Sequence, residues 1–314
     1  MFKYTLQPSG KKMIVDLPDK LEFNYDFLES VSNLVFQVET APCDQVTFRC
    51  KPNVSYEKLC KAYLYNVFAQ IKAHKPAFWN RSLQSTIMSS VHSQKGADFP
   101  PINEIDILKS RELDLYIFRG DVGIQGPINE LTRLMVDRNL AFNPTEIKEF
   151  LSTTIGEIFS NSINHSAQDI TFFMFDITLK NECILLYVNI IDYGTTIVEN
   201  VREYVHRTEN ILKSSKDCMD WAVQSGNTTR SGSGGYGLST LIDYITAVQG
   251  DLYIFSGDAY YRLEDGRIEI DELSAGRFAG TSVTFKVELF KDTSSILKYD
   301  PVEEKLTCIS LDRI

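Results

Sequence analysis

The segment 143–165 constrains the fold most, because it carries the clearest helix signal in the chain. Asn143 suits the N-cap, Pro144 suits the first helical position and Glu146 the third. The apolar positions recur at helical spacing and predict one buried face, made by Ile147, Leu151, Thr154, Ile155 and Ile158. The sequence therefore predicts a long amphipathic helix that packs on another layer, with a domain boundary near residue 140.

The residues after this helix predict a β-rich domain with interspersed helices. Two strand-like segments are joined at Lys180-Asn181, and strong β patterns return near the end of the chain. The expected strands are 169–178, 182–191, 251–256, 259–264, 267–270 and 281–290, and the expected helices are 195–208, 214–225 and 238–250. We predict an α+β fold, in which residues 141–295 form one domain of strands and helices and residues 296–314 a C-terminal tail.

Residues 1–140 predict a smaller α/β domain. Strand-like segments at 12–18 and 44–50 alternate with helical patterns at 25–38 and 55–74, and Ser55 is the expected N-cap of the second helix. The segment 92–104 is rich in turn formers and is expected to be a loop.

Composition narrows the class of protein. The chain has 314 residues, of which 43% are hydrophobic and 24% charged, as in globular proteins of two domains. A net charge of −10 disfavours nucleic acid as a partner. No apolar run reaches the ~18 residues of a membrane span, and the N-terminus lacks a signal-peptide core. Six cysteines without a CxxC pair indicate reduced thiols, so we expect a cytoplasmic protein.

Polar residues follow one edge of the predicted helix. Glu157, Asn161 and His165 are spaced four apart, so they lie next to one another beside the apolar face. An amide oxygen can bind Mg²⁺, while a carboxylate one turn away can activate water or a hydroxyl group. The alternative at this point is a solvated polar edge.

Two more motifs contain glycine residues, and one of them also contains a carboxylate. One strand ends in Asp192-Tyr193-Gly194, which can present a carboxylate while the backbone turns. A cluster of glycines precedes the helix at 238–250, where backbone amides could approach phosphate oxygens: Gly232, Gly234, Gly235 and Gly237. An ordinary turn and a glycine-rich linker are the alternatives.

In chain order, the Glu-x-x-x-Asn helix, the strand-end Asp-x-Gly, the glycine cluster and the late "AGTSVTF" resemble the GHKL ATPase superfamily. That superfamily includes gyrase, a heat-shock chaperone, sensor histidine kinases and a mismatch-repair protein. The resemblance covers residues 143–290. It implies a site for ATP and Mg²⁺, and it implies that residues 141–295 fold as the two-layer α/β sandwich of that family.

The resemblance also implies roles for individual residues. Glu157 corresponds to the general base and Asn161 to the magnesium ligand. Asp192 corresponds to the carboxylate that binds the adenine amino group, and Thr281, after Gly280, lies in the Gly-Thr pair beside the adenine. The other residues expected to bind the nucleotide are His165, Gly194, Thr196, Arg230, Gly234, Gly235, Tyr236, Gly237 and Leu238. Of these, His165 is a feature that resembles the anti-sigma-factor kinases.

The sequence departs from the family pattern at two places. Thr196 stands where the second glycine of Asp-x-Gly-x-Gly is usual, and Thr does not readily adopt positive φ, so we expect a different loop there. The glycines before Leu238 are also shifted against the family's spacing. Arg230 could reach a γ-phosphate or remain a surface residue. The N-terminal half resembles STAS domains through its strand–helix alternation.

Three functions follow from the resemblance. The first is a cytoplasmic ATP-binding regulator with slow hydrolysis, whose nucleotide state changes the contact with a protein partner. The second is an anti-sigma-factor-like serine/threonine kinase, and the third is a scaffold that does not hydrolyse ATP. We expect no membrane partner and leave a homodimer open. A sensor histidine kinase is disfavoured, because none of the four histidines lies in a His-Glu-x-x-x-Pro motif.

Overall fold

The structure is a computed structural model with helices and β-sheets in two compact units, so the predicted α+β class is confirmed. It describes residues 2–7, 10–88, 114–119, 128–129, 144–165, 170–180, 183–229, 235–274, 276–290, 295–300 and 305–310. The first unit comprises Met1–Ile117, Phe172–Met174 and Leu273–Ala279, and the second comprises Phe118–Thr171, Phe175–Glu272 and Gly280–Ile314. The predicted loop at 92–104 lies outside the described residues.

The first unit contains a four-stranded sheet in the order β1-β2-β4-β6. Its strands are β1 (Lys3–Leu6), β2 (Lys12–Asp16), β4 (Gln45–Arg49) and β6 (Ala77–Trp79). β1 runs antiparallel to β2, whereas β2, β4 and β6 are mutually parallel. Alternate residues of the two central strands face the core, because side chains along a strand point to opposite faces: Met13, Val15, Val46 and Phe48 are buried.

Helices connect the parallel strands of this unit. They are α1 (Tyr25–Thr40), between β2 and β4, and α2 (Lys58–His74), between β4 and β6, whereas α3 (Arg81–Met88) follows β6. The Asn24 side chain caps α1 by accepting a hydrogen bond from the Phe27 amide. α2 supplies the centre of the core, where the Phe68 ring stacks on Phe48 with 4.4 Å between centroids.

The predicted N-cap of α2 is wrong. Ser55 lies in the short strand β5 (Ser55–Tyr56), which pairs in parallel with β3 (Lys20–Leu21), and Glu57 is the N-cap. The Ser55 amide donates a hydrogen bond to the Asp19 carbonyl at 2.8 Å. This backbone pairing holds Ser55 in an extended conformation, two residues before the N-cap Glu57.

The second sheet has seven strands in the order β12-β11-β10-β13-β9-β8-β7. Its strands are β7 (Asp114–Arg119), β8 (Ile170–Lys180), β9 (Cys183–Asp192), β10 (Asp251–Gly257), β11 (Ala259–Glu264), β12 (Arg267–Glu272) and β13 (Phe278–Phe290). β13, late in the chain, lies between β10 and β9 and runs antiparallel to β9. Residues 296–314, the predicted tail, contain most of an antiparallel pair, β14 (Ser295–Asp300) and β15 (Lys305–Ser310).

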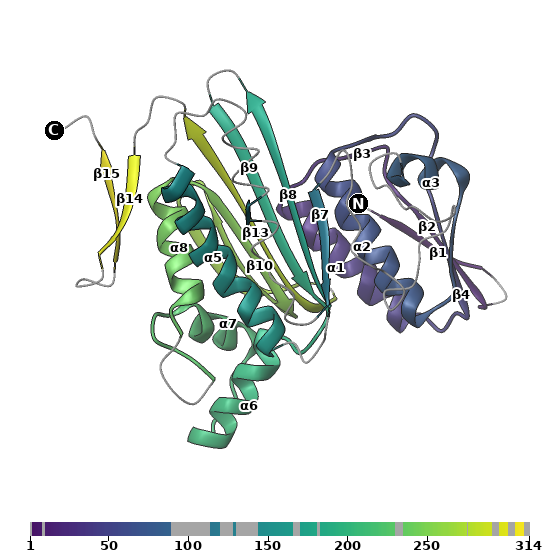
Figure 1. The fold of residues 1–314 in the computed structure, drawn as a ribbon. Helices are drawn as coiled ribbons and strands as arrows, with labels where there is room; N and C mark the ends of the chain where they lie inside the picture. Colours follow the sequence, from purple (N-terminus) through teal and green to yellow (C-terminus); the bar gives the residue numbers. More distant parts are fainter. Residues whose placement is uncertain are drawn as a thin grey trace. The chain divides into compact units, whose positions relative to one another are not determined.

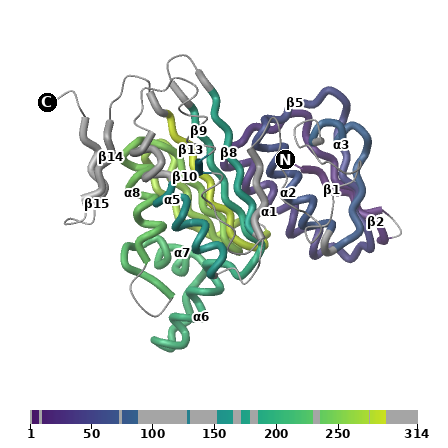
Figure 2. The backbone as a smooth tube through the Cα atoms, viewed as in Figure 1, coloured from purple at the N-terminus to yellow at the C-terminus, as the bar shows by residue number. Residues whose placement is uncertain are grey.

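Helices of the second unit lie on one face of this sheet (Figure 1, Figure 2). They are α5 (Pro144–His165), α6 (Ile197–Glu209), α7 (Ser215–Val223) and α8 (Gly237–Ala247). α5 begins at Pro144, as predicted. Among the described residues, no helix is both long and apolar enough to cross a membrane.

Thr196 has a structural role at the start of α6. Its φ is −77°, so this position requires no glycine. The Thr196 side chain accepts a hydrogen bond from the Glu199 amide, and the Glu199 carboxylate accepts one from the Thr196 amide, both at 3.0 Å. This capping box begins α6 directly after the strand-end carboxylate of Asp192.

We expect Thr196→Ala to lower the free energy of unfolding by about 1 kcal/mol, the usual cost of losing an N-cap side chain. Chemical denaturation checks this value. Thr208→Ala is the control, because Thr208 lies exposed in the last turn of α6 and bonds only the Tyr204 carbonyl there. Equal effects of the two substitutions would contradict the capping role of Thr196.

Candidate functional site

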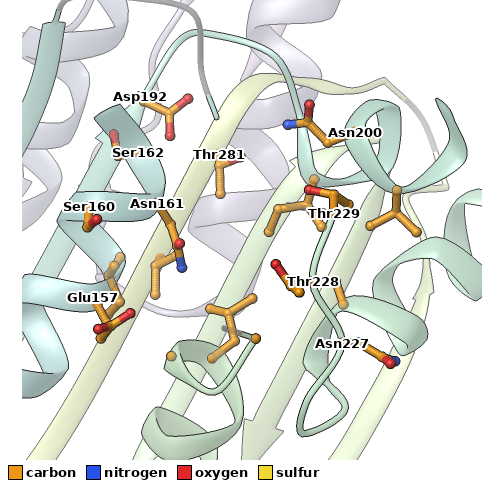
Figure 3. A pocket seen from close by; sticks show the side chains of 18 of the residues that line it. Glu157, Ser160, Asn161, Ser162, Asp192, Asn200, Asn227, Thr228, Thr229 and Thr281 are labelled. Carbon is orange, nitrogen blue, oxygen red and sulfur yellow. The ribbon is translucent and has the colours of Figure 1, made fainter. Parts of the chain in front are cut away.

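A cavity of about 320 Å³ lies in the second unit between the helices and the sheet. Its walls come from α5, the end of β9, α6, α7, the α7–α8 connection, the start of α8 and β13. Figure 3 shows Glu157 and Asn161 on one wall, Asn227 and Thr228 across from them, and Asp192 with Ser162 toward one end. Its volume is in the range of small-molecule sites.

The carboxylate end is built by the pairing of β9 with β13. Asp192, the last residue of β9, is opposite Thr281 in the register. The Asp192 Oδ1 accepts a hydrogen bond from the Gly194 amide at 3.1 Å. Gly280 has a φ of +148°, and a Cβ there would lie 2.0 Å from the Asp192 carbonyl oxygen. Only glycine therefore allows this close approach of the two strands.

Burial changes the acidity of Asp192. The residue is 5% exposed, and this burial raises the pKa of its carboxyl group to about 7. Hydrogen bonds from the Gly194 amide, the Ser162 hydroxyl and the Thr281 amide act in the opposite direction by favouring the charged form. Ser162 also shares a 2.8 Å hydrogen bond with the buried Thr171 hydroxyl. These hydrogen bonds therefore fix the orientation of the Asp192 carboxyl group.

The other end of the cavity combines α5 with the start of α8. Glu157 and Asn161 lie one turn apart on α5, and both line the cavity. A Cβ at Gly237 would lie 3.2 Å from the Glu157 Oε2 and 3.4 Å from the Asn161 Nδ2. Tyr236 at the N-cap makes no side-chain capping bond. The positive end of the α8 dipole thus lies beside the carboxylate and the amide.

The α7–α8 connection closes one wall of the cavity. The Gly226 amide donates a hydrogen bond to the Gly235 carbonyl at 3.1 Å, which joins the two ends of the loop between them. The Asn227 side chain donates to the Trp221 carbonyl at 2.8 Å and ties the loop to α7. Gly235 has a φ of +90°, and a Cβ there would lie 2.3 Å from the Asn227 carbonyl oxygen. This close approach requires glycine at position 235.

The structure brings together seven of the residues predicted to form a nucleotide site. Glu157, Asn161, Asp192, Gly235, Gly237, Leu238 and Thr281 all line the cavity. Three others do not line the cavity. Gly194 donates a hydrogen bond to Asp192, Thr196 caps α6, and Tyr236 is 47% exposed. His165 ends α5, and its side chain lies outside the described part, as do Arg230 and Gly234.

Several cavity residues were not predicted from the sequence. Those with polar side chains carry hydroxyl or amide groups: Ser160, Ser162, Thr195, Asn200, Asn227, Thr228 and Thr229. Ser162 follows Asn161 directly, and a hydroxyl at that position of a buried helix is a signal that could have been noticed. The others lie in α5, just before α6, in α6 or in the α7–α8 connection, and no residue pattern distinguishes them from ordinary surface positions.

The ionisable side chains of the described lining are all acidic. Glu157 and Asp192 are its charged residues, and no Lys or Arg contributes to the lining among the residues that the structure describes. Those same residues contain no cluster of three or more His, Cys, Asp or Glu side chains that could hold a metal ion. Within the described lining, donors for an anionic ligand must therefore come from backbone amides, hydroxyl groups and side-chain amides.

Comparison of the sequence with models of known protein families and with curated proteins finds no match.

We expect Asp192→Asn to remove a pH dependence of stability. The folded-state pKa of about 7 lies above the unfolded value of about 3.9, so the stabilising contribution of neutral Asp192 is complete below pH ~4 and lost as the pH rises through about 7. Relative to the variant, the wild-type chain should lose about 2 kcal/mol of unfolding free energy between pH 5 and 7. Denaturation across this range measures the loss.

The exposed Asp258 in the β10–β11 turn supplies the control. Asp258→Asn should keep the wild-type dependence on pH. Parallel pH profiles for the wild-type chain and Asp192→Asn would contradict the buried carboxyl group as the source of the effect.

Proposed function

We propose that this chain is an ATP-binding regulatory protein with a Mg–ATP site of the GHKL type in its second unit. Nucleotide state would change a contact with a protein partner, and hydrolysis would be slow. The observation that carries the proposal is the convergence of four separate sequence motifs on one cavity: Glu157 and Asn161, Asp192, Gly235 and Gly237, and Thr281 all line it. These motifs lie in different elements, so their convergence is not a consequence of local sequence.

The Asp192 end fits an adenine base. A buried carboxyl oxygen can accept a hydrogen bond from an exocyclic amino group, whereas the carbonyl oxygen of guanine at that position would be repelled. The apolar lining beside it comes from Ile190, Ile197, Val201 and Val283. A planar base buried among these side chains would be held by apolar contact and selected by the carboxyl group.

The α8 end fits the phosphate groups. Glycines at 235 and 237 let the backbone approach a ligand, and the uncapped first turn of α8 offers amide donors near its positive end. Among the described lining residues no Lys or Arg opposes the phosphate charge. A magnesium ion bound with the phosphates would supply this neutralisation, and it needs only one or two protein oxygens. Asn161 would provide such an oxygen.

Glu157 would accept the proton of the attacking water. It lies on the same helix as Asn161, one turn away, and both border the first turn of α8. The α7–α8 connection would respond to the nucleotide, because its residues Thr228, Thr229 and Gly235 line the cavity. A change in this loop is the simplest route from nucleotide binding to an altered partner surface.

We also propose that the first unit is STAS-like. Its β-α-β-α-β order with parallel β2, β4 and β6 and an antiparallel β1 is the arrangement that supports this. We place the protein in the cytoplasm, with a protein as partner of the nucleotide-bound form.

We expect Asp192→Asn to weaken ATP binding about 5- to 150-fold, because an amide group can set a donor against the amino donor of adenine, at a cost of roughly 1–3 kcal/mol. Isothermal titration calorimetry with Mg²⁺ measures both affinities. Asp258→Asn should bind ATP like the wild-type chain, and GTP should bind much more weakly than ATP. Equal ATP affinities for the wild-type chain and Asp192→Asn would remove Asp192 from the site.

We expect Glu157→Gln to lower ATP turnover about 10²–10⁴-fold with ATP affinity nearly unchanged, because the carboxylate acts only on the proton. Asn161→Ala should instead abolish the effect of Mg²⁺ on ATP affinity. Phosphate release and calorimetry with and without Mg²⁺ distinguish the two roles. Normal turnover by Glu157→Gln would mean that this edge of α5 is only a polar surface.

A further inference from the structure

A hydroxyl side chain of the α7–α8 connection faces the same end of the cavity as Glu157. Thr228 and Thr229 both line the cavity. In Figure 3 the Thr228 side chain points into the cavity, across from Asn161 and Glu157, whereas Thr229 lies farther along, near Asn200. Thr228 therefore shares the end of the cavity where the start of α8 lies, and Thr229 lies closer to the Asp192 end.

The backbone immediately before Thr228 is held by several contacts. The neighbouring Asn227 binds the Trp221 carbonyl through its side-chain amide, and Gly226 is bonded to Gly235. The carbonyl oxygen of Asn227 also lies against Gly235, where only the missing side chain leaves room for it. These contacts fix Thr228 against α7 and the residues leading into α8, so its position is not that of a free loop tip. An in-line reaction requires a nucleophile that is held in position.

We propose that Thr228 is a phosphorylation site that the chain modifies itself, with ATP as the phosphoryl donor. This inference rests on the proposed function, and it assigns to that site an acceptor within the same chain. It differs from hydrolysis only in the nucleophile, because a threonine hydroxyl takes the place of water. It differs from a kinase acting on a partner because the acceptor already lies in the cavity wall.

The transfer balances with the groups named. The Thr228 Oγ forms a bond to the γ-phosphorus while the bond from that phosphorus to the β,γ-bridging oxygen breaks, and ADP leaves. The hydroxyl proton passes to the Glu157 carboxylate, which serves as general base. ATP and the threonine hydroxyl are the only reactants, so no further co-reactant is required.

The product would limit its own formation. A phosphothreonine carries about −1.5 to −2 charges at neutral pH. At position 228 this charge would lie in a cavity whose described charged lining residues are Glu157 and Asp192, both acidic. Repulsion should weaken the binding of a second ATP molecule, so that modification switches the site toward its empty state. The change in charge is also a signal that a partner could read on the α7–α8 connection.

The test uses the full-length chain, Mg²⁺ and γ-labelled ATP, with no other protein present. We expect stable label on the chain, located at Thr228 by tandem mass spectrometry of the tryptic peptide 217–230. This peptide also contains Ser225 and Thr229, so fragmentation must separate the three hydroxyl residues. The initial rate per chain should not change over about 30-fold dilution, because an intramolecular reaction has no dependence on concentration.

Three variants sharpen the result. Thr228→Val should lose the label, and a thermal midpoint close to that of the wild-type chain shows that the variant folds. Glu157→Gln should lower labelling about 10²–10⁴-fold. Ser225→Ala is the matched control, since Ser225 is exposed on the same loop outside the cavity, and it should be labelled like the wild-type chain.

Each of the other possible results would overturn one specific claim. Label at Thr229, or at any residue other than Thr228, overturns the assignment. A rate per chain that falls on dilution overturns the intramolecular route. Release of free phosphate without labelled protein overturns the phosphorylation site and leaves the proposed ATPase function intact. No binding of ATP in calorimetry overturns both.

Discussion

The pairing of β13 with β9 is the contact on which the cavity depends. It brings Thr281 opposite Asp192 across nearly ninety positions of sequence, and it requires Gly280 because the Asp192 carbonyl oxygen occupies the space of a side chain. The same pairing places β13 in the middle of the sheet, between β9 and β10. Without this pairing, α5 and α8 would not pack on one continuous sheet, and the residues on their facing edges would not line one cavity.

Burial gives the two carboxylates of the cavity different chemical settings. Asp192 lies at the end of a central strand, and burial raises its pKa to about 7, against the hydrogen bonds that favour its charge. Glu157 lies on the exposed edge of α5, beside the start of α8. Two acids with separate environments are suited to separate tasks. This separation supports our proposal that one acid recognises a base and the other accepts a proton.

Local sequence accounts for much of the fold. Pro144 marks the start of α5, and the predicted strand segments 12–18 and 44–50 contain β2 and β4. The Ser55 cap failed because the β3–β5 pairing, a contact between distant residues, outweighed a local capping preference. Local capping and periodicity are properties of a few neighbouring residues, so they can be read directly, whereas pairing between distant segments cannot.

The sequence by itself determined the residue types of the candidate site: the Glu-x-x-x-Asn spacing, the strand-end Asp192 and the glycines before α8. Only the tertiary structure decided that Thr196 caps a helix, that Ser162 supports Asp192, and that Thr228 faces the Glu157 end. The physical reason is the distance along the chain between the residues that interact. Spacing along one helix or strand follows from its own geometry, but a hydroxyl group in a loop gains its neighbours only when distant strands and helices have packed.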